Sequence, residues 1–170
     1  MNLSKYFKGV YVELQRSEIH FADYNPRDIS DDEHKALKRG VKQYGLLGGL
    51  IVNKRTGFTI VQGHQRIKCL DELEKYNPAT KENDYKVRAE VIDVDKKTEM
   101  TINILLNNPN VQGKFNSEKM AELIPQIEYK DAGLTEADLS LFGVGFMLQT
   151  EAEQNLAESL DGLMTEVNEE

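Results

Sequence analysis

Cysteine and long apolar runs are scarce in this sequence, and both shortages limit what the chain can be. Its 170 residues include one cysteine, Cys69. A single cysteine excludes an internal disulfide and any cysteine-rich zinc site. Without a long apolar segment, the sequence predicts neither a secretion signal nor a membrane span. We therefore expect a cytoplasmic protein with one core of ordinary size and a short appendage.

Basic residues are absent after Lys130, although the chain holds 21 of them. Residues 131–170 contain ten carboxylates and no Lys or Arg, whereas residues 1–130 carry all 21 basic and 19 acidic residues, a net charge of +2. An acidic end is repelled by nucleic acid, but a nearly neutral body can bind phosphate through a local patch. The composition therefore argues against DNA contact over the whole surface, but not against contact on one face.

Carboxylates are also missing where a helix normally has them. Residues 58–73 predict a short apolar strand, a turn at Gly63 and an amphipathic helix that begins near His64. The start of a helix is the positive end of its dipole and favours acidic side chains, but none occurs before Asp71. The stretch therefore predicts a site for a phosphate or carboxylate, bound by backbone N–H groups and by Arg66. The alternative is a surface corner whose basic groups are solvated.

The rest of the pattern alternates short strands with amphipathic helices. Ser30 and Glu33 form a capping box that opens the first helix, and Gly45 ends it. In the helix that ends before Pro109, the residues expected to be buried are Met100, Ile104 and Leu105. We expect strands at 9–14, 50–52, 58–61 and 87–91. Three later helices are also expected. Ser117 caps the first, Thr135 with Asp138 starts the second, and the third is an acidic amphipathic helix at 151–165.

Three carboxylates lie around the start of the helix that follows the last predicted strand. They are Asp93, Asp95 and Glu99. Carboxylates at the end of a strand can bind a hard cation, so they are candidate metal ligands. The alternative is ordinary helix punctuation, with Asp95 as the N-cap and Glu99 in the first turn. This second interpretation needs no metal.

Four short motifs occur in an order that resembles a known family. An Asn25-Pro26-Arg27 segment precedes the first helix, Gly45 to Leu47 follow it, Gly63 to Arg66 open the second helix, and Asn107-Asn108 end the third. This order is similar to that of the N-terminal domain of ParB-like proteins, whose fold is shared with sulfiredoxin, over roughly residues 10–116. The resemblance implies an α+β fold, with a small mixed sheet packed by helices and followed by a short helical acidic extension.

The resemblance also implies a ligand, which is cytidine triphosphate with Mg²⁺ in ParB proper, or another nucleotide. The box from Gly63 to Arg66 would contact the phosphates, which agrees with the anion site predicted from the residues themselves. The residues expected to bind the ligand are Gly63, His64, Gln65, Arg66, Asn25, Arg27, Gly45, Asn107 and Asn108.

The sequence departs from the family in three respects. Asn107 stands where ParB has a magnesium-binding glutamate, so nucleotide hydrolysis is not implied. His64 occupies the position of the reacting cysteine of sulfiredoxin, which argues against sulfiredoxin chemistry. No DNA-reading or dimerisation region of ParB is recognisable downstream. The run from Asn107 to Asn116 looks more like the ParB-type domains of phages and mobile elements.

Three functions are compatible with these residues. The first is a nucleotide- or DNA-phosphate-binding module in phage or mobile-element DNA metabolism or partitioning. The second is an enzyme, either a nuclease or a nucleotide hydrolase or kinase, with His64 as the candidate acid–base group. The third is an adaptor that binds a protein partner through residues 149–170. The expected organisation is a ParB/sulfiredoxin-like domain at 1–116, a short helical extension at 117–148 and an acidic helix or tail at 149–170. Whether the chain forms oligomers stays open.

Overall fold

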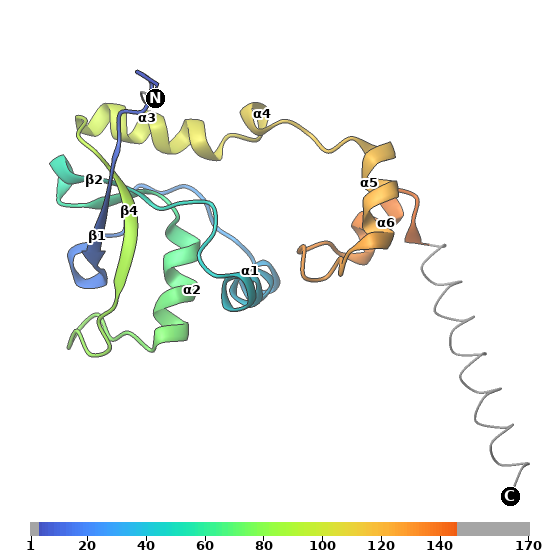
Figure 1. Ribbon diagram of the computed structural model, residues 1–170, viewed down its shortest axis with the longest axis horizontal. Helices are drawn as coiled ribbons and strands as arrows, with labels where there is room; N and C mark the ends of the chain where they lie inside the picture. Colours follow the sequence, from blue (N-terminus) through green and yellow to red (C-terminus); the bar gives the residue numbers. More distant parts are fainter. Residues whose placement is uncertain (1–3, 146–170) are drawn as a thin grey trace, which may run out of the picture. The chain divides into compact units, whose positions relative to one another are not determined.

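The computed structural model describes residues 4–145, which form two separate units. The first unit ends at Gly113 and the second begins at Lys114 (Figure 1). No helix among the described residues has the length and apolar character needed to cross a membrane. The acidic helix expected at 151–165 lies outside the described residues.

A four-stranded mixed sheet forms the centre of the first unit (Figure 1). Its strands are β1 (Val10–Gln15), β2 (Ile51–Asn53), β3 (Thr59–Gln62) and β4 (Lys86–Ile92), in the spatial order β1-β4-β2-β3. β4 pairs antiparallel with β1 and parallel with β2, whereas β2 and β3 form an antiparallel hairpin. The four strands predicted from the sequence are confirmed, with their ends shifted by one residue or so.

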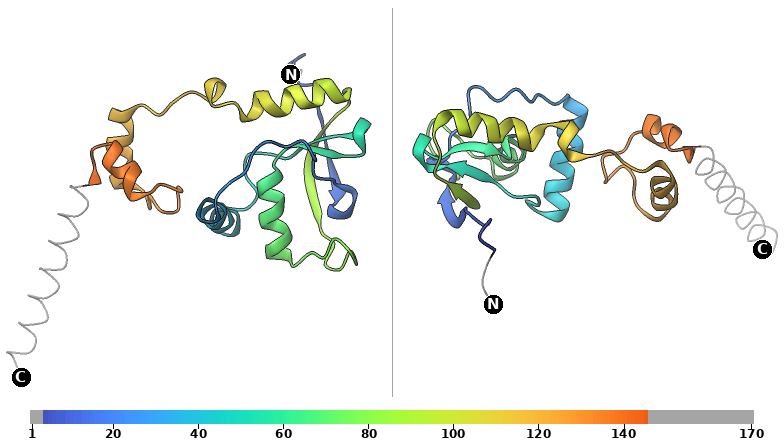
Figure 2. Two further views of the ribbon diagram at one scale, coloured as in Figure 1. Left: turned by 180° about the vertical axis from the view of Figure 1, so that it is seen from behind. Right: turned by 90° about the horizontal axis from the view of Figure 1, so that it is seen from above.

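Two helices, α1 (Asp31–Tyr44) and α2 (His64–Glu74), pack against each other beside this sheet (Figures 1 and 2). The capping box of Ser30 and Glu33 and the end of α1 at Gly45 are as predicted. Ile67 of α2 is fully buried in the core together with apolar side chains of the sheet and its connections: Leu14, Ile19, Leu50, Val52, Ile60, Val87 and Ala89. The predicted α+β architecture is therefore confirmed.

The buried face of α3 (Lys96–Asn107) differs from the prediction. Met100, Ile104 and Leu105 are 38%, 51% and 52% exposed, whereas Glu99 and Asn103 are fully buried. The prediction was wrong because it counted only apolar residues at helical spacing. In the structure, two polar side chains of α3 hydrogen-bond to the sheet. Glu99 accepts from Asn53 of β2, and Asn103 donates to Val61 of β3.

Glu99 is the centre of a buried polar network at the start of α3. Its carboxylate accepts hydrogen bonds from Asn53 Nδ2 (2.6 Å), the Tyr24 hydroxyl (2.8 Å), Lys96 Nζ (3.0 Å) and the Thr56 hydroxyl. Burial alone raises the pKa of this carboxyl, but the four hydrogen bonds outweigh it and the pKa is lowered. The ionised form is therefore the buried one, and it fixes α3 against β2.

The second unit is small and helical within the described residues. It contains α5 (Ser117–Leu123) and α6 (Glu136–Leu141), and it has its own core of Ile124, Leu139 and Val144. Thr135 and Asp138 form the predicted capping box of α6. The cap of α5 is Asn116, whose side chain accepts from the Lys119 amide, and not Ser117 as predicted.

Candidate anion-binding site

The connection from β3 to α2 is a left-handed turn at Gly63, whose φ angle is 107°. A Cβ atom there would lie 3.1 Å from Leu50 Cδ1 and would also need this unfavourable φ, so glycine fits best. No side chain of the described residues caps α2, and its first turn contains no acidic residue. The first N–H groups of α2 are therefore available to an anion.

Arg66 projects from the first turn of α2 and is half-buried. Its Nη1 donates to the Leu47 carbonyl oxygen at 2.8 Å, and it forms no salt bridge with any described residue. Burial, followed by the charge of Arg27, lowers the pKa of this guanidinium. Arg66 is thus a cation held by a neutral backbone group and not by a carboxylate.

Gly48 accommodates the Arg66 guanidinium. A Cβ atom on this glycine would lie 2.2 Å from Arg66 Nη1, which is far inside a van der Waals contact. The sequence analysis did not identify Gly48. The only signal was the Gly48-Gly49 pair directly before a strand, where two glycines in succession indicate an unusual backbone.

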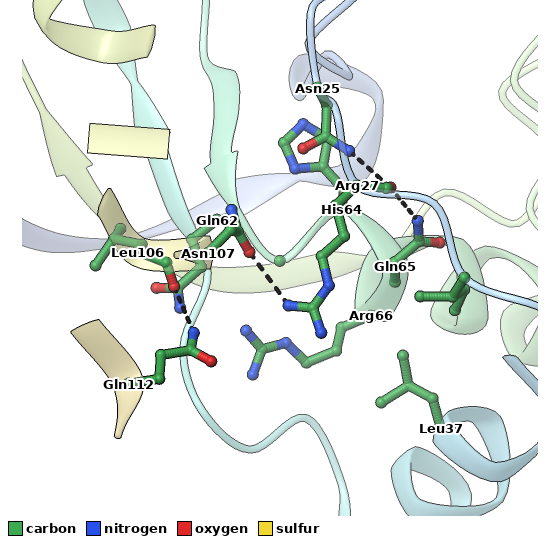
Figure 3. A pocket seen from close by; sticks show the side chains of 12 residues that line it. Asn25, Arg27, Leu37, Gln62, His64, Gln65, Arg66, Leu106, Asn107 and Gln112 are labelled. Atoms are coloured by element: carbon green, nitrogen blue, oxygen red, sulfur yellow. Dashed lines mark hydrogen bonds between the residues drawn. The ribbon is translucent and has the colours of Figure 1, made fainter. Parts of the chain in front are cut away.

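The second cation of the site comes from the loop before α1. Arg27 Nη1 donates to the Asn107 Oδ1 atom at the end of α3 at 3.3 Å. The Arg27 carbonyl oxygen accepts from Asn25 Nδ2 (3.2 Å) and from Gln65 Nε2 (3.1 Å), which fastens the loop to α2 (Figure 3). The Asn25-Pro26-Arg27 segment is therefore fixed next to Arg66.

Asn103 supports this arrangement from inside the core. Its side-chain Nδ2 donates to the Val61 carbonyl oxygen (2.9 Å) and to Asn25 Oδ1 (3.4 Å), and its backbone carbonyl oxygen accepts from Asn107 Nδ2 (2.8 Å). Asn103 thus contacts Asn25 in the loop through its side chain and Asn107 at the end of α3 through its backbone. The sequence analysis missed Asn103 because it expected the apolar face of the helix to be buried.

These residues enclose an open pocket of about 250 Å³ in the first unit. Figure 3 shows the Arg27 and Arg66 guanidinium groups side by side in it, with Asn107 and Gln112 on one side and Gln65 and Leu37 on the other. No carboxylate of residues 4–145 lines the pocket, so the described lining side chains contribute two positive charges and no negative one. The lining residues are Asn25, Arg27, Ile29, Leu37, Gln62, Gly63, His64, Gln65, Arg66, Leu106, Asn107 and Gln112.

Seven of the nine residues expected to bind a ligand line this pocket. The other two do not: Gly45 ends α1, and Asn108 caps the short helix α4 (Pro109–Gln112) by accepting from the Asn110 amide. The structure adds five residues to the expected set, Ile29, Leu37, Gln62, Leu106 and Gln112.

His64 lines the pocket but is held in a structural contact. It is 6% exposed, and its Nε2 accepts a hydrogen bond from the Ala22 amide at 3.3 Å. Burial, with a smaller contribution from Lys68, lowers the pKa of His64 to about 4. The ring is therefore neutral at physiological pH with its proton on Nδ1. In this role it orders the chain that leads into the Asn25 loop.

The three candidate metal-binding carboxylates are engaged by other groups of the protein. Asp93 pairs with Arg55 (2.7 Å) and Lys54 (3.1 Å), Asp95 caps α3 through the Thr98 amide, and Glu99 lies in its buried network. Among residues 4–145, no group of three or more His, Cys, Asp or Glu side chains is placed to hold a metal ion. The helix-punctuation interpretation therefore fits Asp95, the N-cap of α3, whereas Asp93 lies in ion pairs and Glu99 in a buried network.

Comparison with solved structures identifies the fold. The chain is similar to the crystal structure of the C-terminally truncated chromosome-partitioning protein ParB from Caulobacter crescentus complexed with CTP-gamma-S, with a TM-score of 0.53 and 18% sequence identity over 81% of this chain and 72% of that one. This chain thus shares the fold of that ParB structure, an α+β fold with a small mixed sheet packed by helices.

A Pnob8-like ParB-N domain is also similar, with a TM-score of 0.44 and 16% identity over 69% of this chain and 47% of that one. No family model matches the sequence. No curated protein matches it either.

Proposed function

We propose that this chain is a ParB-like module that binds the phosphates of a nucleotide in the pocket between α2, the Asn25 loop and the end of α3. We further propose that it acts in phage or mobile-element DNA metabolism or partitioning. The observation that carries the proposal is the pair of Arg27 and Arg66 at the start of a helix that no described side chain caps, in a pocket whose described lining residues include no carboxylate.

Electrostatics favours a negatively charged ligand at this place. Like charges in a half-buried pocket repel, and the lowered pKa of Arg66 has both burial and Arg27 as its causes. A phosphate group between the two guanidiniums would replace this repulsion by charge-assisted hydrogen bonds, and the N–H groups at the start of α2 would add to them. The binding of an anion therefore relieves an unfavourable arrangement.

The fold suggests which nucleotide to test first. The ParB structure from Caulobacter crescentus, with which this chain shares its fold, is a complex with CTP-gamma-S. CTP is therefore the first ligand to test, and DNA phosphate is the second.

Magnesium does not fit the lining residues well. In proteins Mg²⁺ is usually held by one or two carboxylates together with phosphate oxygens. The oxygen atoms that the pocket side chains offer are those of neutral amides, such as Asn25, Asn107 and Gln112. We therefore assign no Mg²⁺ ligand to this chain and derive no hydrolytic step. His64, the candidate acid–base group, is turned to the Ala22 amide and has a low pKa, so catalysis is not part of the proposal.

Calorimetric titration with each nucleoside triphosphate, with and without Mg²⁺, tests the proposal. We expect CTP to bind, and we expect Arg66→Ala to weaken binding by about tenfold or more, because a charge-assisted bond to phosphate is lost. Arg55→Ala is the matched control, since Arg55 is exposed and paired with Asp93 away from the pocket. Absence of heat with every nucleotide, together with no mobility shift of DNA, would overturn the proposal.

A further inference from the structure

We infer that Gly48, in the loop before β2, is a positioning residue for Arg66, and that Gly48 and the Leu47 carbonyl oxygen together set the direction in which this guanidinium meets an anion. The inference rests on the proposed function for its ligand. It adds a residue that is not among those lining the pocket.

The contacts of the guanidinium define its place on the loop. Arg66 Nη1 lies 2.8 Å from the Leu47 carbonyl oxygen, which accepts its hydrogen bond. At Gly48, an added Cβ would be 2.2 Å from Nη1, 3.4 Å from Cζ and 3.9 Å from Nη2. The guanidinium therefore lies directly against the face of the glycine where a side chain would begin.

This arrangement leaves part of the guanidinium for a ligand. Nη1 is the only nitrogen of the Arg66 guanidinium for which a described residue provides an acceptor. The planar group has five N–H donors in a fixed geometry, so holding one nitrogen also fixes the direction of the others. The loop thus pre-orients Nε and Nη2 before any anion arrives, which lowers the entropy lost on binding.

A methyl group at Gly48 would move Arg66 and leave the fold in place. The clash involves the end of a long, flexible side chain and not the backbone or the core. Gly48 has a φ of +81°, so Gly48→Ala also strains the loop. Gly49 has nearly the same φ, +76°, but a Cβ there meets nothing within 4 Å. Gly49→Ala therefore reproduces the backbone strain without touching Arg66, and it is the matched control.

Titration of both variants with CTP tests the inference. We expect Gly48→Ala to weaken binding about tenfold and Gly49→Ala to change it less than twofold, with similar melting temperatures for the two variants. In an Arg66→Ala background, Gly48→Ala should weaken binding no further, because the side chain that it displaces is gone. Equal affinities of Gly48→Ala and Gly49→Ala, or additive effects with Arg66→Ala, would overturn the inference.

A second measurement keeps the inference testable if the wild type binds no nucleotide, a result that would refute only the proposed function. Protein labelled with ¹⁵N-arginine gives a side-chain NMR signal for Arg66, which Arg66→Lys assigns by its loss. We expect this signal to shift in Gly48→Ala and to stay in place in Gly49→Ala. An unshifted signal in Gly48→Ala would show that Gly48 does not position Arg66.

Discussion

At the scale of single residues, Arg27 and Arg66 differ from other arginines of the protein in the groups that accept their hydrogen bonds. Arg16, by comparison, is buried and forms a bidentate contact with Asp71, with distances of 2.8 and 2.9 Å. The pocket arginines donate instead to neutral oxygens, Arg27 to Asn107 and Arg66 to Leu47. A neutral acceptor orients a guanidinium without the ion pair that a carboxylate would form with it, which suits a binding role better than a structural one.

The shape of the Arg66 side chain should matter as well as its charge. Lysine carries the same charge but lacks the planar fork that binds phosphate bidentately and that the Leu47 carbonyl holds in place. We expect Arg66→Lys to bind CTP more weakly than the wild type by several-fold, and more tightly than Arg66→Ala. Calorimetry on the three proteins measures the order. Equal affinity of Arg66→Lys and the wild type would mean that only charge is used.

His64 should make the stability of the protein depend on pH. Its pKa is about 4 in the folded protein and 6.5, the ordinary value of histidine, in the unfolded chain. Between these two pH values the unfolded chain therefore binds more protons than the folded protein. The free energy of unfolding should therefore fall as the pH drops from about 6.5 to about 4, by up to roughly 3 kcal/mol. Urea denaturation at pH 7 and pH 5 measures the effect.

His64→Gln provides the control for this pH dependence. Glutamine cannot titrate in this range, and its side-chain oxygen can accept a hydrogen bond as His64 Nε2 does from the Ala22 amide. The loss of stability between pH 7 and pH 5 should be smaller in the variant than in the wild type. If both proteins lost the same unfolding free energy between pH 7 and pH 5, groups other than His64 would be its cause.

The sequence predicted the chemistry of the pocket residues better than their individual roles. The lack of a carboxylate before Asp71 is a local pattern, so it could be seen without coordinates. The burial of His64 and the contact between Arg66 and Gly48 depend on parts of the chain that are distant in sequence. For this reason His64, the candidate acid–base group of the sequence analysis, is found buried with Nε2 accepting a hydrogen bond from the Ala22 amide.

At the scale of elements, α3 is the helix whose packing differs most from its pattern. Its buried side chains are a carboxylate and an amide, and both are hydrogen-bonded to the sheet or its connections. This attachment fixes the position of Asn107, which lies at the end of the helix and contacts Arg27. The polar face of α3 therefore links the core to the pocket.

Two substitutions on α3 should show that its buried face is polar and its exposed face apolar. Asn103→Ala should cost about 1–3 kcal/mol of unfolding free energy, because it leaves the buried Val61 carbonyl oxygen without a donor. Ile104→Gln, at a position that is 51% exposed, should change it by less than about 0.5 kcal/mol. Urea denaturation monitored by circular dichroism gives both values. A larger loss of unfolding free energy in Ile104→Gln than in Asn103→Ala would show that the apolar face of α3 is the buried one.

Helix ends were predicted more reliably than helix faces. A cap is a contact between residues three apart, so the motifs at Ser30, Asp95 and Thr135 carry the information locally. Which face of a helix is buried depends on its neighbours. Apart from Lys96 in α3 itself, the polar partners of Glu99 are Tyr24 in the loop before α1 and Asn53 and Thr56 in the β2–β3 hairpin. No pattern within α3 indicates these three distant partners.

At the scale of the whole molecule, the two units have separate cores. All residues that line the pocket precede Gly113, and the core of the second unit consists of residues after Lys114. We expect a fragment of residues 1–113 to fold cooperatively and to bind CTP with the affinity of the full chain, within about twofold. Thermal unfolding and calorimetry test this. A fragment without a cooperative transition would show that the first unit depends on the second.

The overall fold could be predicted from the order of motifs, but the arrangement of the strands could not. Alternation of apolar and charged residues predicted that β4 has one exposed face, and Val87 and Ala89 are indeed buried while Lys86 and Arg88 are exposed. Its place between β1 and β2 arises from pairing with residues far away in sequence. Local patterns contain no information on such partners.

The central position of β4 has a consequence for how the protein is made. β1 forms its ladder with β4, from Val10 with Val91 to Gln15 with Lys86, and with no other strand of the described residues. During translation, β1 leaves the ribosome first and has no partner until residue 92 has emerged. The ladder between β1 and β4 therefore joins segments far apart in the sequence, and such long-range pairing is a slow step in folding.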